Sequence, residues 1–139
     1  MTCVIDCSFS SSLFLPDENS SISTNFFKKY INKKSLLVPV LWWYETCNVI
    51  YIAVKRKRIT PLQAQEILNL LNALKLETDT EYGLLFSTNI FNLSNLYSIS
   101  AYDAVYLDLS LRKKATLATF DAELKAAALK AGVPVIPAQ

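Results

Sequence analysis

Short apolar runs alternate along the chain with longer stretches whose apolar residues recur every three or four positions. Residues 2–6 form a short, β-branched run that predicts a buried strand entering a serine-rich turn at residues 8–12. Helical spacing of apolar residues predicts a helix over residues 19–31. Residues 35–39 are a second strand candidate. The chain therefore opens as strand, helix, strand.

The middle of the chain is predicted to be helical. The pattern over residues 41–58 ends in the basic run Lys55-Arg56-Lys57-Arg58, which suits a helix C-terminus. Thr60, Pro61 and Gln63 supply an N-cap, a first-turn proline and a capping-box partner for a helix to about Lys75. Its apolar stripe predicts core packing, or alternatively a groove for a partner's helix or a dimer face. That stripe comprises Leu62, Ile67, Leu70, Leu71 and Leu74.

No charged residue lies between Glu81 and Asp103, a gap long enough to span a bilayer. Serine and asparagine residues punctuate the gap, and asparagine is costly in lipid. We therefore expect a half-buried helix and loop here, without membrane insertion.

The last part of the chain continues the alternation. Ser100 and Asp103 predict a capped helix to about Arg112, followed by a strand over residues 115–119. A helix over residues 121–131 is stopped by Gly132, and a last strand covers residues 133–136. Together the elements predict one α/β domain over residues 1–139, with a mostly parallel central sheet and helices on both faces. Ligands of such sheets bind beyond the carboxyl ends of the strands.

Composition narrows the chemistry. The chain has 139 residues, 52% of them hydrophobic, and no histidine, which excludes histidine general bases and histidine-containing zinc sites. Its two glycines stand alone, so no glycine-rich phosphate loop is present. With 14 basic and 12 acidic residues, the net charge of +2 does not indicate a protein that coats nucleic acid.

The cysteines and the N-terminus indicate the compartment. Cys3, Cys7 and Cys47 match no zinc-binding or redox spacing and are predicted to be reduced core thiols. The N-terminus lacks a basic region and places Asp6 where a signal peptide would be apolar, so a cytoplasmic location is expected.

Four acidic residues stand out from the solvated surface. Asp6 and Asp121 follow predicted strands, and Asp103 lies in the first turn of a predicted helix. Each of these three alone is explained as a helix cap or a dipole partner. Glu45 falls on an apolar helical face, where a carboxylate is costly unless it is paired. The alternative for Glu45 is that it pairs with a basic residue such as Lys33 or Lys34, or that its side chain faces solvent.

Taken together, these acids predict a metal site. An open α/β fold gathers strand ends and helix starts at one edge, and four carboxylates in one crevice would repel one another unless a divalent cation neutralised them. An all-oxygen ligand set without histidine or thiolate favours Mg²⁺ or Mn²⁺. Such ions bind phosphate oxygens and activate water, which points to phosphodiester hydrolysis.

Four short motifs then resemble those of PIN-domain ribonucleases, in particular the toxin half of VapBC-type toxin–antitoxin pairs. Their order and spacing cover nearly the whole chain. They are Val4-Ile5-Asp6-Cys7-Ser8, then Tyr44-Glu45-Thr46-Cys47-Asn48 after Pro39, then Ala101-Tyr102-Asp103-Ala104-Val105-Tyr106-Leu107, and finally Leu117-Ala118-Thr119-Phe120-Asp121 with Gly132-Val133-Pro134-Val135. Trp42-Trp43 is bulkier than usual for the family, and Ala122 follows Asp121 where some members carry a further acid, for which Glu123 is a possible substitute.

The resemblance implies a metal-dependent endoribonuclease. Asp6, Glu45, Asp103 and Asp121 would coordinate Mg²⁺ or Mn²⁺. Ser8 and Thr119 would support the site, and Asn48 would hold Glu45 or a water. The implied partners are an RNA substrate, a cognate antitoxin and a second copy of the chain. The alternative is a catalytically silent PIN-like module whose main role is to bind another protein.

Overall fold

The computed structural model describes residues 2–15 and 19–138, whose strands form one parallel five-stranded sheet. The order across the sheet is β3-β2-β1-β4-β5, which puts β1 at the centre. The strands are β1 (Thr2–Ile5), β2 (Ser35–Pro39), β3 (Glu77–Asp79), β4 (Thr116–Ala118) and β5 (Val135–Ile136). Ile5 is in register with Ala118, so β1 and β4 end at the same edge.

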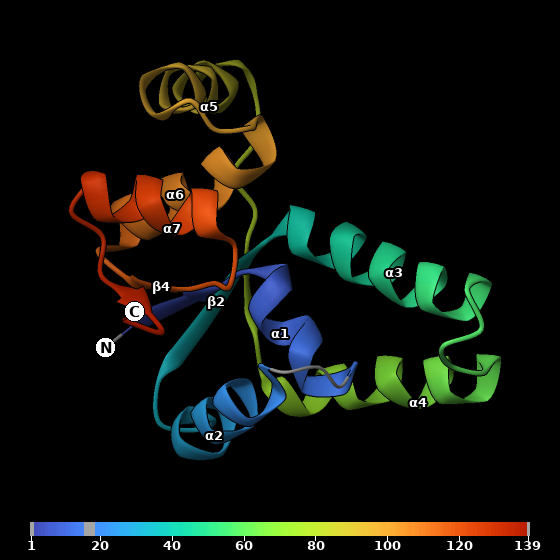
Figure 1. Ribbon diagram of the computed structural model, residues 1–139. Coiled ribbons are helices and arrows are strands. Elements are labelled where there is room, and N and C mark those ends of the chain that lie inside the picture. Colours follow the sequence, from blue (N-terminus) through green and yellow to red (C-terminus); the bar gives the residue numbers. More distant parts are fainter. Residues whose placement is uncertain (1, 16–18, 139) are drawn as a thin grey trace.

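Helices cover both faces of the sheet, as the alternation of elements predicts. Figure 1 shows α6 and α7 on one side and α1 and α2 on the other, while α3 and α4 project together as a helical arm. Helix α5 packs against α6. The helices are α1 (Cys7–Phe14), α2 (Ser20–Tyr30), α3 (Val40–Lys55), α4 (Pro61–Leu70), the short 3₁₀ helix η1 (Leu71–Leu74), α5 (Leu84–Tyr97), α6 (Ala101–Lys113) and α7 (Ala122–Lys130).

The capping signals in the sequence are confirmed. Thr60 and Gln63 form the predicted capping box at the start of α4. The Ser100 hydroxyl accepts a hydrogen bond from the Asp103 backbone N–H at the start of α6. Gly132 has a φ of +82°, a conformation that glycine adopts without steric cost, where the chain leaves α7. Local side-chain chemistry therefore fixes where these helices begin and end.

Two local predictions are wrong. The serine-rich segment is not a turn: residues 7–14 form α1, in which Ser12 donates to the Phe9 carbonyl and to the Ser23 hydroxyl of α2. These bonds satisfy a buried hydroxyl inside a helix, which the serine-rich composition does not reveal. The sequence prediction also omits β3, an edge strand of three mostly exposed residues with no apolar run.

The core lies between the sheet and its helices. Val4, Ile5 and Leu117 are fully buried, so the strand predictions for the core hold, and Trp42 of α3 is fully buried as well. Two parts of the core prediction are wrong, however. Cys47 is exposed, whereas Cys3 and Cys7 are buried free thiols. In the apolar stripe, Ile67, Leu71 and Leu74 are buried, but Leu62 and Leu70 are 72% and 61% exposed, because α4 packs on α3 with one side only.

The segment without charges becomes α5 and the loop to α6, as expected, although most of α5 is exposed. Among the described residues, no helix combines the length and apolarity needed to span a bilayer.

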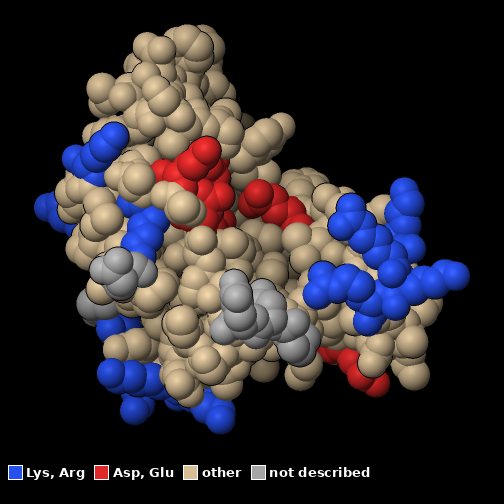
Figure 2. Space-filling model, viewed as in Figure 1, with Lys and Arg blue, Asp and Glu red and all other residues tan. Residues whose placement is uncertain are grey.

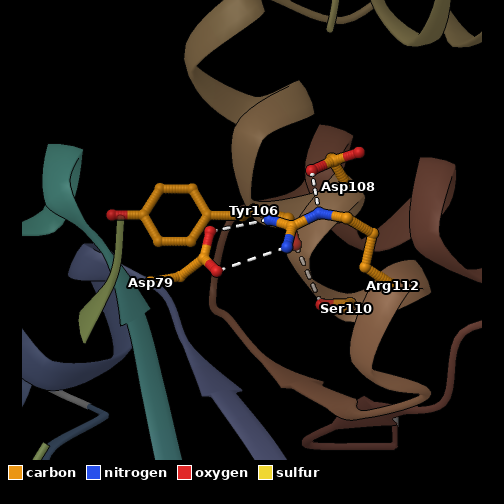
Figure 3. A network of polar contacts seen from close by, with 5 residues as sticks. All are labelled: Asp79, Tyr106, Asp108, Ser110 and Arg112. Carbon is orange, nitrogen blue, oxygen red and sulfur yellow. Dashed lines mark hydrogen bonds and ion pairs between the residues drawn. The ribbon is translucent and has the colours of Figure 1, made fainter. Parts of the chain in front are cut away.

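A charged clamp fastens β3 to α6 (Figure 3). The Arg112 guanidinium donates two hydrogen bonds to the Asp79 carboxylate, at 2.7 and 3.2 Å, and a third to Asp108 at 2.7 Å. Both acids raise the pKa of Arg112, and Asp108 is buried. The bidentate geometry makes this pairing stronger than an ordinary surface ion pair.

We predict that Arg112→Met lowers the free energy of unfolding by about 2–3 kcal/mol, because it leaves the buried Asp108 carboxylate without its cation. Urea denaturation at pH 7 measures the loss. Lys113→Met, which removes the exposed neighbouring charge, serves as control. Equal stability of the two variants would contradict the clamp.

Candidate active site

The central strand delivers a buried carboxylate to the edge of the sheet. Asp6 follows β1 directly, and its backbone N–H donates to the Ala118 carbonyl of β4. The Ser8 and Thr119 hydroxyls both donate to Oδ2 of Asp6, each at 2.6 Å. Burial raises the pKa of Asp6, and these hydrogen bonds oppose the rise. The two hydroxyls to which the family resemblance gives a supporting role therefore both bind the Asp6 carboxylate.

The same hydroxyls tie the ends of β1 and β4 together. Ser8 Oγ accepts a hydrogen bond from the Phe120 N–H, and Thr119 Oγ1 accepts one from the Asp121 N–H, both at 3.0 Å. Each hydroxyl thus donates to Asp6 and accepts from the loop that carries Asp121. This network fixes the loop next to the buried carboxylate.

Glu45 lies on α3 and is bonded directly to α6. The hydroxyl of Tyr106, a residue that is 1% exposed, donates to Glu45 Oε1 at 2.5 Å. Burial is the main cause that raises the pKa of Glu45, and the charge of Asp6 adds to it. In the described chain no lysine forms an ion pair with Glu45, so its partner is Tyr106 and neither Lys33 nor Lys34.

Asp121 and Asp103 occupy helix starts in different ways. Asp121 caps α7, because its Oδ1 accepts from the Leu124 N–H at 2.9 Å. Asp103 does not cap α6, since the hydroxyl of Ser100 fills that role. Burial, followed by the charges of Asp121, Asp6, Glu45 and Glu123, raises the pKa of Asp103 to about 6. Capping therefore explains the position of Asp121, whereas Asp103 lies in the first turn of α6 as a helix-dipole partner without capping it.

Asp6, Glu45, Asp103 and Asp121 influence one another electrostatically, and we call the region that they surround the acidic hollow. Figure 2 shows acidic side chains gathered near the middle of the molecule in this view, with basic side chains toward its periphery. Asp6 raises the pKa of both Glu45 and Asp103, which places all three within electrostatic reach. Asp121 also raises the pKa of Asp103, so each of the four acids affects another, while their joint role as a metal site stays a prediction.

The type of ligand atom that these residues offer suits a hard divalent cation. The site residues offer carboxylate and hydroxyl oxygens as ligands, and the mutual repulsion of the carboxylates is what a cation would relieve. Within residues 2–15 and 19–138, no three acidic or thiol side chains form a ready-made coordination shell. Mg²⁺ suits such a spread set, because it keeps several waters and needs only one or two direct carboxylates.

Comparison with known proteins identifies the class to which this fold and its acidic hollow correspond. The sequence matches the PIN domain family over residues 3–130, and the chain belongs to that family. PIN domains are typically nucleases that use a divalent metal. A search of curated proteins found no significant match.

Solved structures with the same fold include toxins of VapBC systems. PAE2754 from Pyrobaculum aerophilum has a TM-score of 0.70 at 18% identity, over 99% of this chain and 85% of that chain. VapBC2 from Rickettsia felis, bound to a promoter DNA fragment, has a TM-score of 0.70 at 12% identity, with 97% of each chain covered. VapC20 from Mycobacterium tuberculosis, a toxin that cleaves the sarcin–ricin loop, has a TM-score of 0.65 at 13% identity, over 90% of this chain and 94% of that chain.

Three further polar residues lie within three positions of the candidate acids along the chain. Asn48 is exposed one turn beyond Glu45 on α3, and its side chain makes no hydrogen bond to the part of the chain that is described. Glu123 is exposed in the first turn of α7 and adds to the negative field at Asp103. The sequence motifs do not reveal the bond of Tyr106 to Glu45, but the position of Tyr106 three residues after Asp103 is a signal, because residues at that helical spacing share a face.

We predict that Asp103→Asn stabilises the metal-free protein at pH 7.5 by about 1–2 kcal/mol, a value reduced for solvent screening. The folded-state pKa of about 6 exceeds the ordinary value of 3.8, so folding is favoured most below pH 4, and this contribution is lost as the pH rises through 6. The variant lacks the charge that causes the loss.

Denaturant unfolding in EDTA at pH 7.5 and pH 4 measures the effect, with Glu66→Gln on the exposed side of α4 as control. The stabilisation should shrink toward pH 4. A constant difference at both pH values would show that the charge of Asp103 is not strained.

Proposed function

We propose that this protein is a metal-dependent endoribonuclease and the toxin of a VapBC-type toxin–antitoxin pair. The observation that carries the proposal is the electrostatic strain of the carboxylates, seen in the pKa of Asp103 near 6, at the edge of a PIN-domain sheet. Strongly perturbed carboxylates in a hollow are typical of catalytic and metal-binding sites. The similar fold of VapC20, whose substrate is an RNA loop, supports RNA as the substrate class.

The residues divide the work of hydrolysis. Asp6, Asp103 and Asp121 would hold the cation, and Glu45 would ligate a second ion or orient the attacking water. A bound divalent cation neutralises the negative charges and promotes deprotonation of water. Ser8 and Thr119 fix Oδ2 of Asp6 in place. Tyr106 occupies Oε1 of Glu45, which leaves Oε2 to receive a hydrogen bond from a water aligned for in-line attack on phosphorus.

The alternative is a catalytically silent PIN-like module that binds other proteins. It is favoured by one observation, the lack of a ready-made three-ligand cluster among the described residues. Cleavage and metal binding separate the two functions, because a silent module would neither cleave RNA nor take up Mn²⁺ at Asp6.

We predict that Asp6→Asn reduces Mg²⁺-dependent RNA cleavage at least about 100-fold, because it removes the charge held at the centre of the site. Glu66→Gln removes one exposed carboxylate elsewhere and should leave the rate unchanged. Circular dichroism and thermal melting confirm that both variants are folded. Undiminished cleavage by Asp6→Asn would refute the assignment.

An apolar groove supports an antitoxin as partner. Its volume is about 330 Å³, and one of its walls belongs to α1 and the other to α4 and η1. Amphipathic helices commonly bind in such grooves. The groove contains three of the leucines of the predicted stripe, Leu70, Leu71 and Leu74, and its other lining residues are Leu13, Phe14 and Ile67.

A homodimer is supported by a second apolar surface, on α5. Leu84, Leu85, Phe91 and Leu96 are between 69% and 85% exposed there. Large apolar side chains clustered on one helix mark an interaction surface more often than a solvated one.

We predict that Leu70→Glu abolishes copurification with the protein encoded by the adjacent upstream reading frame, since it places a charge in the groove. RNA cleavage should remain. Leu62→Glu is the matched control, because Leu62 is equally apolar and 72% exposed but lies outside the groove. Retained copurification by Leu70→Glu would move the antitoxin site elsewhere.

A further inference from the structure

The basic run ends the helical arm with a cluster that the site chemistry does not use. We call Lys55, Arg56, Lys57 and Arg58 the basic tip; all four are exposed. In the described parts of the chain the two ion pairs both belong to Arg112, so no acidic side chain there neutralises the tip by direct pairing. The tip is therefore a concentrated positive surface that is open to an anionic ligand.

The arm holds the tip at a fixed place relative to the acidic hollow. Helix α3 starts directly after β2, and the Trp42 indole N–H donates to Ser10 of α1 at 2.9 Å. Helix α4 packs back along α3. Figure 1 shows both helices extending away from the sheet, and in Figure 2 basic side chains cover the outer end of this arm. The near end of α3 carries Glu45 and the far end carries the tip.

Helical geometry aligns the tip with the hollow. Arg56 follows Glu45 by about 11 residues, close to three full turns, so the two residues lie on the same side of α3 roughly 16 Å apart. Asn48 is exposed between them. Arg56 is thus on the helix face that leads out of the hollow.

The charge layout favours a polyanion that reaches from one end of the arm to the other. The carboxylates of the hollow repel phosphate when no cation is bound, so attraction must come from elsewhere. Beside the tip lies a cavity of about 370 Å³, lined in part by Lys57, Arg58 and Thr60. Phosphates recur at every nucleotide of a single RNA strand, so a short stretch of RNA can place one phosphate at the acidic hollow and another at the basic tip.

We propose that the basic tip binds the phosphate backbone of the RNA substrate, roughly 16 Å along α3 from Glu45. The inference rests on the proposed ribonuclease function and adds to it a second, metal-independent contact. It assigns the binding of substrate and the chemistry to opposite ends of one helix.

The test measures binding of a fluorescently labelled single-stranded RNA by anisotropy in the Asp6→Asn background, in which cleavage is blocked. Arg56→Gln/Arg58→Gln removes two charges from the tip and leaves Lys57, whose φ is +58°, in place. Lys28→Gln/Lys33→Gln is the matched control, because it removes two exposed charges at and beyond the end of α2.

We expect the tip variant to weaken RNA binding and to lower the slope of log affinity against log salt by about 1.4, which is ~0.7 for each lost phosphate contact. The ratio of the RNA affinity of the parent to that of the tip variant should therefore grow about sevenfold when the salt concentration falls from roughly 200 to 50 mM. The control pair should change the slope by less than half as much. In the enzyme that retains Asp6, and therefore its activity, the tip substitutions should raise KM for RNA and leave kcat unchanged.

Equal effects of the two pairs would overturn the inference, because the tip would then add only general charge. Unchanged RNA binding with loss of antitoxin binding would also overturn it and make the tip a protein contact. Tip-dependent RNA binding without cleavage by the parent protein would contradict the proposed function alone, whereas cleavage indifferent to the tip would contradict this inference alone.

Discussion

Asp6 carries its carboxylate into the interior at the end of the central strand, and the surrounding structure is arranged to keep it there. Two hydroxyls from different elements donate to the same oxygen of Asp6, and the backbone N–H groups of Phe120 and Asp121 in turn donate to those hydroxyls. A buried charge without such bonds would cost several kcal/mol. Hydrogen bonds from the protein replace water around the Asp6 carboxylate. Because these bonds come from both strand ends, they also fix the ends of β1 and β4 and the position of Asp121.

Directional polar contacts join α6 to two other elements of the fold. Tyr106 connects α6 to Glu45 of α3, and Arg112 connects the other end of α6 to β3. Both contacts are strong because one partner is charged and neither is fully exposed. Apolar packing holds these elements together, and the bond between Tyr106 and Glu45 adds a directional contact between the two helices that carry Glu45 and Asp103.

The parts of the fold and site that the sequence predicted were those governed by local chemistry. The caps at Thr60, Ser100 and Asp121 are written within four residues of each helix start, and the positions of Asp6 and Asp121 follow from the rule that parallel strands end together. The rest depends on contacts between distant segments. Helix α1 needed the bond between Ser12 and Ser23, strand β3 needed its neighbour β2, and the pairing of Tyr106 with Glu45 joins residues that are 61 positions apart.

Helix α6 holds a capping hydroxyl, a candidate ligand, the bond to Glu45 and the arginine clamp within its 13 residues and the residue before it. Each turn of the helix therefore meets a different neighbour. A single inserted residue would rotate all that follows by about 100° and point the clamp or the tyrosine into the wrong layer. Over its length, this helix can vary by substitution but has no place for an insertion or a deletion, unlike the loop at the outer end of the arm.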